Sequence, residues 1–232
     1  MHHIEILYCF KFDADNHKQY KLQMNESTYE LQIEHDDCAP TWTDLEFNQC
    51  QHCPLFSDEV EKCPVAVNLI PFIDLCGNLS SYDTLDVEIQ TSQRSYFVKE
   101  TTTQRAFSSL LGLIIATSNC PHTSFFRSMA RFHLPLANEH ETLFRAASSY
   151  LLMQYFKKQS GKETDFNLQG LEEIYKNIQI VNKSMAMRLR AACQNDAAVN
   201  SIILLDMLAK GVPYSIEEAL SELRYLYKDV QI

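Results

Sequence analysis

Hydrophobic and polar residues alternate along much of the first hundred positions, which is the pattern of β-strands with one buried face. The alternation covers residues 4–12, 20–24 and 29–33, and it returns at 85–90 and 96–98. Polar segments rich in turn-forming residues separate these runs. We therefore predict an antiparallel sheet of about five strands, apolar on one face and solvated on the other.

From residue 102 onward the hydrophobic period becomes that of helices. Asn138 with Glu141, and Ser215 with Glu218, have the capping-box spacing that marks helix starts. Helical periodicity covers five segments: 103–118, 138–158, 168–193, 196–210 and 215–227. An apolar sheet face and apolar helix stripes bury each other, so the predicted fold is α+β with a C-terminal helical bundle against the sheet.

Residues 40–64 follow neither period and are acidic and rich in cysteine, and a short helix is expected after them at about 65–75. We read them as an irregular insertion between the two sets of strands. The predicted organisation is an acidic β-rich half, 1–101, and a helical half, 102–232. No linker rich in Gly, Pro or Ser separates the halves, so they can form one cooperative domain.

Composition narrows the functional classes. The chain has 232 residues, 46% of them hydrophobic, and the longest apolar run, 110–116, is far shorter than the roughly 20 residues that span a bilayer. The first residues carry neither the basic flank nor the apolar core of a secretion signal, so we expect a cytoplasmic protein with no membrane association. The five glycines are widely separated, which argues against a Gly-rich phosphate-binding loop.

The charge is unevenly distributed. Residues 1–101 hold 18 acidic residues and 6 Lys or Arg, a net charge of −12, whereas residues 102–232 hold 12 and 14, a net charge of +2. An acidic front half repels phosphate backbones, and the basic residues of the second half alternate with acids. We therefore expect no nucleic-acid partner.

Eight cysteines are many for a cytoplasmic chain, and four of them cluster in a way that suggests a metal site. Cys50 and Cys53 form a C-x2-C pair, Cys63 follows nine residues later, and Cys120 lies between two predicted helices. Three of the four precede proline, which fixes the backbone next to a ligand. The other cysteines read as small buried residues or, in one case, as a loop thiol: Cys9, Cys76, Cys193 and Cys38.

Four thiolates suit zinc, which we favour, or an iron–sulfur cluster; unligated thiols are the remaining alternative. Either metal centre would order the irregular 40–64 segment, because metal-binding free energy becomes folding free energy. His52 and His122 lie beside the proposed ligands and can substitute for one of them, although each taken singly reads as a surface histidine.

Two enzymatic interpretations of these cysteines are weaker. Cys50 and Cys53 could form a thioredoxin-like redox pair, but that motif opens a helix after a strand, whereas Pro54 here follows an irregular segment. Cys120 could act as a nucleophile, but a phosphate-binding cysteine loop needs glycines and a closer arginine than Arg127. Whether the chain is an enzyme stays open, and the sequence favours a non-enzymatic protein.

Arg127 and Arg131 stand one helical turn apart and could together bind a carboxylate or phosphate. The alternative is that they pair with acidic residues of the N-terminal half, which carries the surplus negative charge. We favour the second interpretation and keep anion binding as a possibility to test.

The cysteine pattern as a whole resembles an uncharacterised bacterial protein family. The resemblance rests on Cys-x2-Cys-Pro, Cys-Pro and Asn-Cys-Pro-His-Thr, within the segments 50–55, 63–66, 119–123, 130–137 and 150–152. It implies a bacterial cytoplasmic origin and nothing about activity. The residues themselves predict a metal-binding interaction or regulatory protein with a protein partner; the alternatives are an iron–sulfur redox or sensor protein and a thiol oxidoreductase.

Overall fold

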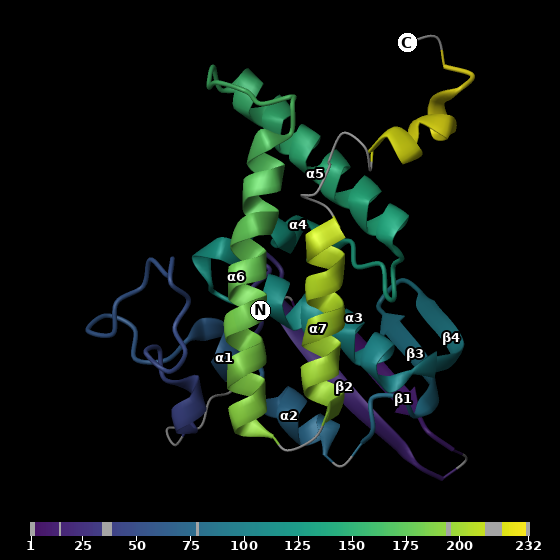
Figure 1. Cartoon of the computed structure of the whole chain (residues 1–232). Coiled ribbons are helices and arrows are strands. Elements are labelled where there is room, and N and C mark those ends of the chain that lie inside the picture. Colours follow the sequence, from purple (N-terminus) through teal and green to yellow (C-terminus); the bar gives the residue numbers. More distant parts are fainter. Residues whose placement is uncertain are drawn as a thin grey trace.

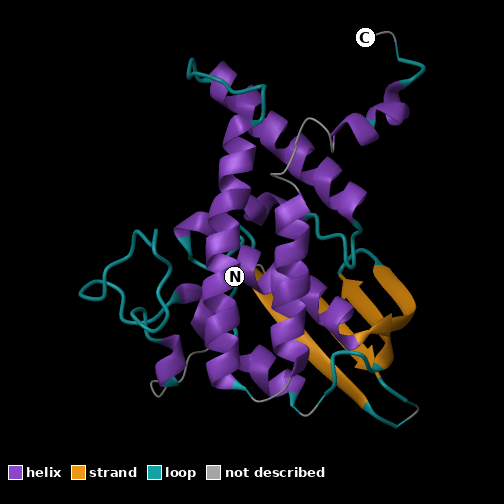
Figure 2. Cartoon of the chain, in the orientation of Figure 1, coloured by secondary structure: helices purple, strands orange, loops and turns teal. Residues whose placement is uncertain are grey.

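The alternating segments form the strands of an antiparallel sheet in the computed structural model, which describes residues 3–13, 15–33, 39–77, 79–193, 196–211 and 220–230. The strands are β1 (His3–Lys11), β2 (His17–Asn25), β3 (Thr84–Thr91) and β4 (Ser95–Thr102). Within the described residues the sheet has four strands in the order β2-β1-β3-β4, so the N-terminal strand is central. Figure 2 shows this sheet on one side of a larger helical body.

One face of the sheet is buried, as the alternation predicts. Tyr8 and Phe10 of β1 and Leu22 of β2 are fully buried, and Phe10 contacts Phe107 edge-to-face with ring centroids 5.0 Å apart. Phe107 belongs to α3 (Thr103–Ala116), which lies between the sheet and α7 (Asp196–Gly211) in Figure 1. The predicted α+β class is therefore confirmed.

The expected strand at 29–33 is wrong. Tyr29 has a left-handed backbone (φ 57°), which interrupts an extended run, and only Leu31 forms an isolated bridge, to Met24. The Leu31 amide then donates to the carbonyl of Thr117, at the end of α3. The neighbouring amide of Gln32 donates to the carbonyl of Gln23 at 2.8 Å, so the segment runs beside β2 but pairs with it at a single bridge and is not a fifth strand.

The helical half closely follows the predicted segments. Four long helices account for most of it: α3, α5 (Glu139–Gln159), α6 (Gln169–Ala192) and α7. The shorter elements of this half are η2 (Pro121–Phe126), α4 (Arg127–Arg131) and η3 (Arg224–Tyr227), and one further short turn, η1 (Thr41–Thr43), lies in the irregular segment of the first half. Of the predicted helix 215–227, residues 215–219 lie outside the described residues.

The short helix expected at 65–75 is split into α1 (Pro64–Asn68) and α2 (Ile70–Cys76). Pro71 has no amide to donate to the preceding turn, so the first helix ends at Asn68, with Leu69 as its C-cap, and a second begins at Ile70. The irregular segment before α1 lies beside α6 in Figure 1. No helix among the described residues is long and apolar enough to cross a membrane.

Candidate metal centre

Four cysteines from three chain segments line one small cavity. Cys50 and Cys53 come from the irregular segment, Cys63 from the residue before α1, and Cys120 from the loop between α3 and η2. The cavity has a volume of about 20 Å³, enough for one water-sized sphere. Residues up to seventy positions apart are thus brought to one point.

Local backbone structure positions each thiol. The amide of Cys53 donates to the carbonyl of Cys50 at 2.9 Å, which closes a tight turn around the C-x2-C pair. Cys63 and Cys120 each stand immediately before a helical turn that opens with proline. Both residues have extended backbone, as residues before proline prefer, and both are buried.

A buried arginine completes the wall of this cavity. Arg188 of α6 is 1% exposed, and its guanidinium donates to the backbone carbonyls of Trp42, Asp44 and Leu45 at 2.7–2.9 Å. Its Nε is buried with no hydrogen-bond partner among the described residues. Burial lowers the pKa of Arg188, and the adjacent cysteines Cys63, Cys50 and Cys53 oppose that shift. A positive charge therefore lies next to the thiols and anchors the irregular segment to α6.

Two thiols of this cavity, those of Cys50 and Cys120, lie in surroundings that disfavour the thiolate. Burial raises the pKa of Cys120 to about 12, partly offset by a hydrogen bond from the backbone amide of His122. Burial also raises the pKa of Cys50, against a hydrogen bond from the Ser184 hydroxyl. A nucleophilic cysteine needs the opposite shift, so neither thiol has the environment of a reactive one.

The two histidines proposed as substitute ligands lie together at the edge of the centre. Their rings stack in parallel with centroids 3.9 Å apart, and His122, unlike His52, lines the cavity. The Nε2 atoms make backbone contacts: His52 to the carbonyl of Asn177 at 3.1 Å, and His122 to the carbonyl of His52 at 3.0 Å. Each histidine is half-buried and has a tertiary contact, unlike a free surface side chain.

The thiols line the cavity without forming a ready ligand cage. Among the described residues, no group of three or more His, Cys, Asp or Glu side chains is arranged so that it could hold a metal ion. Cysteine sulfur is a good zinc ligand, and the cavity is large enough for one ion. The four cysteines nevertheless line the wall of the cavity without forming a coordination shell. The metal therefore remains a prediction.

The cysteines set aside from the sequence lie elsewhere. Cys9 and Cys76 are buried, and Cys193 is half-buried with its thiol donating to the carbonyl of Leu189 at 3.1 Å. Cys38 lies outside the described residues. None of the three described ones lines the cavity.

The arginine pair of α4 has other partners. Arg127 forms an ion pair with Glu30 at 3.2 Å and donates to the carbonyl of Ser118 and the side chain of Asn119. For Arg127 this is the pairing with N-terminal acids that we favoured for both arginines. Arg131 lies over the ring of Phe132, with its guanidinium 5.4 Å from the ring centroid. Anion binding by the two arginines stays a prediction.

Sequence reasoning missed Arg188, although the signal was present. Apolar residues recur at helical spacing through 168–193, and Arg188 falls three positions after Met185 on the same stripe. A charged residue on the buried stripe of a helix is expected to have specific partners. Here those partners are the carbonyls of the segment that carries the C-x2-C pair.

A family profile with the description "Domain of unknown function (DUF6901)" matches residues 6–228. The chain belongs to this family. DUF6901 spans the sheet and the helical half and includes all four cysteines, so the expectation of an uncharacterised family is confirmed. No curated protein and no solved structure matches the chain.

Proposed function

We propose that this member of DUF6901 is a non-enzymatic, cytoplasmic metal-binding protein that acts through contacts with a protein partner. Zinc is the favoured metal, with Cys50, Cys53, Cys63 and Cys120 as ligands. The observation that supports this most strongly is that these four cysteines line one cavity together with the buried Arg188. Binding an ion would draw the thiols inward from the wall of the cavity.

Charge balance favours a thiolate centre at this place. Four thiolates around Zn²⁺ carry a net charge of −2, which is costly in a buried site unless a positive group lies close. Arg188 supplies that charge, and within the described residues no acidic side chain forms an ion pair with it. Its free Nε–H is also a donor for a metal-bound sulfur.

The size of the cavity favours one ion over a cluster. A volume of about 20 Å³ accommodates a single water-sized sphere, whereas an iron–sulfur cluster contains several iron and sulfide atoms. Tetrahedral coordination by four sulfurs from a C-x2-C pair and two further cysteines is common in structural zinc sites. His122 is the nearest alternative ligand, because it lines the same cavity.

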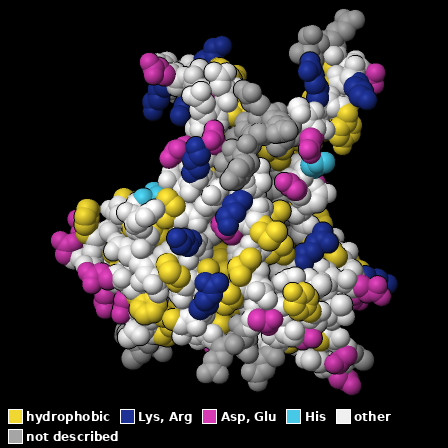
Figure 3. All heavy atoms as spheres, viewed as in Figure 1, with side chains coloured by type: hydrophobic (Ala, Val, Ile, Leu, Met, Phe, Trp, Pro, Cys, Tyr) yellow, Lys and Arg dark blue, Asp and Glu magenta, His cyan; other side chains and the backbone are white. Residues whose placement is uncertain are grey.

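The segment that the metal would order also offers a contact surface. Glu46, Asp58, Glu59 and Glu61 are exposed on it, and Phe56 is 66% exposed among them. Acidic side chains gather along the outer edge of this segment at the left of Figure 3. An exposed aromatic ring within an acidic surface fits a protein partner with a basic and apolar patch.

The test is the metal content of the purified protein, measured by inductively coupled plasma mass spectrometry on the wild type and two variants. We expect about one zinc per chain in the wild type, as a single four-sulfur site requires. Cys63→Ser should lose most of the zinc, whereas Cys9→Ser, which changes a buried thiol outside the cavity, should retain it.

Two results would count against the proposal. Iron in the purified protein, together with a brown colour and visible absorption, would indicate that these cysteines bind an iron–sulfur cluster and not zinc. Neither metal at near-stoichiometric amounts, in protein purified under anaerobic conditions, would remove the metal-binding function altogether.

A further inference from the structure

A second, much larger cavity lies in the helical half. Its volume is about 310 Å³, and α3, α4, α5, α6 and α7 all contribute to its wall. Its wall is mainly apolar; Leu113, Phe126, Met129, Leu134, Leu204 and Leu205 are among the lining residues. None of the four cysteines of the candidate metal centre lines it. A mostly apolar cavity of this size, with a few polar groups, has the character of a small-molecule site.

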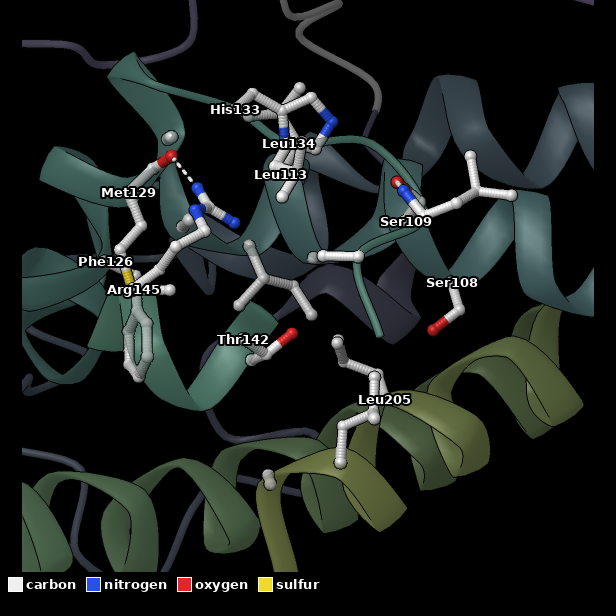
Figure 4. Close-up of a pocket in the computed structure, with 18 of the residues that line it drawn as sticks. Ser108, Ser109, Leu113, Phe126, Met129, His133, Leu134, Thr142, Arg145 and Leu205 are labelled. Atoms are coloured by element: carbon white, nitrogen blue, oxygen red, sulfur yellow. Dashed lines mark hydrogen bonds between the residues drawn. The ribbon is translucent and has the colours of Figure 1, made fainter. Parts of the chain in front are cut away.

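An arginine without an acidic partner projects into this cavity. Figure 4 shows Arg145 reaching in from α5, with a dashed hydrogen bond to the carbonyl of Met129. Its Nη2 donates to that carbonyl at 2.6 Å and to the carbonyl of Phe132 at 2.9 Å. Within the part of the chain that the structure describes, no carboxylate forms an ion pair with Arg145. The guanidinium is thus held in place by two carbonyls, with no carboxylate of the described residues in ion-pair contact; Glu141 acts on it only from a distance.

Apart from Arg145, the buried polar groups of the wall are neutral. His133 lines the cavity, and its Nε2 is 2.5 Å from the hydroxyl of Tyr8; burial keeps the pKa of this ring at about 3, so the imidazole is uncharged near pH 7. Ser108 and Thr142 reach toward the same space from α3 and α5 in Figure 4. The positive charge of the interior therefore comes from Arg145.

The cavity also holds a polar atom with no partner. Asn182 of α6 is 1% exposed and lines the cavity, and its Oδ1 has no hydrogen-bond partner among the described residues. Buried polar atoms usually have partners in the protein or in bound molecules. The guanidinium, with no carboxylate in ion-pair contact, indicates that the cavity takes a molecule with an anionic group; the Asn182 oxygen needs a donor, which a water molecule entering with the ligand can supply.

We propose that this cavity binds a small amphipathic carboxylate, with its carboxylate on the Arg145 guanidinium and its hydrocarbon chain against the apolar wall. A guanidinium forms paired hydrogen bonds with a planar carboxylate, and exclusion of water strengthens them. Arg105, which is exposed and also lines the cavity, adds a second positive charge for attracting an anion. A saturated chain of about ten carbons suits a cavity at the lower end of the size range of ligand sites. The inference does not depend on metal binding by the cysteines.

The test is titration of the full-length protein with decanoate, followed by isothermal calorimetry and by two-dimensional NMR of the amide signals. We expect saturable binding to the wild type and a loss of affinity of about 10- to 100-fold in Arg145→Gln, which removes a charge-assisted contact. Arg131→Gln is the matched control, because Arg131 does not line the cavity, and it should bind as the wild type does.

Chemically matched probes separate the carboxylate from the chain. Decanol and decyltrimethylammonium have the same hydrocarbon and should bind at least ten-fold more weakly than decanoate. Equal binding of decanol and decanoate, equal binding of decanoate to wild type and Arg145→Gln, or no binding of decanoate to the wild type would each overturn the proposal.

A cavity-filling variant keeps the test decisive if Arg145→Gln fails to fold. Leu204→Trp adds volume at a half-buried wall position and leaves the backbone contacts of Arg145 intact. Its circular dichroism spectrum should match that of the wild type, while its affinity for decanoate should fall by at least ten-fold. Unchanged affinity in the folded Leu204→Trp protein would place the ligand elsewhere and overturn the proposal.

Discussion

Arg188 combines a buried charge with three backbone carbonyls that depend on it. Trp42, Asp44 and Leu45 offer these carbonyls, and each would lose a charged donor if the guanidinium were removed. We expect Arg188→Met to lower the free energy of unfolding by roughly 3–5 kcal/mol. Urea denaturation followed by circular dichroism, with a chelator present so that metal loss is not the cause, measures this change.

Arg190 is the matched control for that substitution. It belongs to the same helix, two positions further on, and it is exposed. Arg190→Met should change the free energy of unfolding by less than about 0.5 kcal/mol. Similar losses in the two variants would mean that the carbonyl contacts of Arg188 do not contribute as we describe.

His133 makes the stability of the fold sensitive to acid. Burial, and then the charge of Arg145, lower the pKa of this imidazole from 6.5 to about 3 in the folded protein. Between these two pH values the unfolded chain takes up a proton that the folded chain does not, so the free energy of unfolding falls as the pH drops. The slope from this residue reaches about 1.4 kcal/mol per pH unit.

The variant His133→Gln isolates this effect, because glutamine does not titrate and its carbonyl can still accept from Tyr8. We expect its free energy of unfolding to fall less steeply than that of the wild type between pH 6.5 and 4.5, measured by urea denaturation at several pH values. Parallel pH profiles would show that His133 titrates alike in the folded and unfolded chains.

At the scale of elements, hydrophobic periodicity located the long helices and the four strands because each buries one face against the core. The period could not predict where a tertiary hydrogen bond overrides it. Residues 29–33 alternate like a strand, yet Tyr29 has a left-handed backbone, the Leu31 amide bonds to Thr117, and the pairing with β2 is limited to one bridge. Residues 65–75 have one apolar pattern, yet Pro71 divides them into two helices.

The junction of α5 and α6 depends on close approach at Gly170. A Cβ at this position would collide with the hydroxyl of Tyr150, which donates to Asp165 at 2.8 Å, and the amide of Gly170 donates to the same carboxylate oxygen. We expect Gly170→Ala to lower the free energy of unfolding by about 1–3 kcal/mol.

A double-mutant cycle tests the cause. In the background of Tyr150→Phe the hydroxyl is gone, so adding Gly170→Ala should cost clearly less than it does alone. Chemical denaturation of the four proteins gives the coupling free energy. An additive cycle would locate the cost of the alanine in the helix backbone and not in the tyrosine.

At the scale of the whole molecule, the sequence predicted the cysteine set but not its surroundings. Cys-x2-Cys spacing and proline neighbours are local patterns, so Cys50, Cys53, Cys63 and Cys120 could be selected along the chain. The contact of Arg188 with the irregular segment and the cavity around Arg145 arise from packing of distant helices. The helical stripe marks Arg188 as a residue that needs partners, but no local pattern identifies those partners or the cavity, so both were found only in the structure.

A metal at the four cysteines would join the irregular segment to the end of α3, so its ligands should contribute equally to stability. We expect Cys120→Ser and Cys53→Ser to lower the melting temperature of the metal-loaded protein by similar amounts, because losing either thiolate opens the same cross-link. Differential scanning calorimetry measures both. A much smaller shift for Cys120→Ser would indicate three cysteine ligands, with His122 or His52 as the fourth.

X-ray absorption at the zinc edge of the purified, zinc-containing protein tests the four-cysteine centre most directly. The expected first shell is four sulfur atoms at about 2.3 Å, with no need for a nitrogen or oxygen ligand. A first shell of nitrogen and oxygen atoms would show that the zinc is bound elsewhere on the chain, and would contradict a metal centre built from Cys50, Cys53, Cys63 and Cys120.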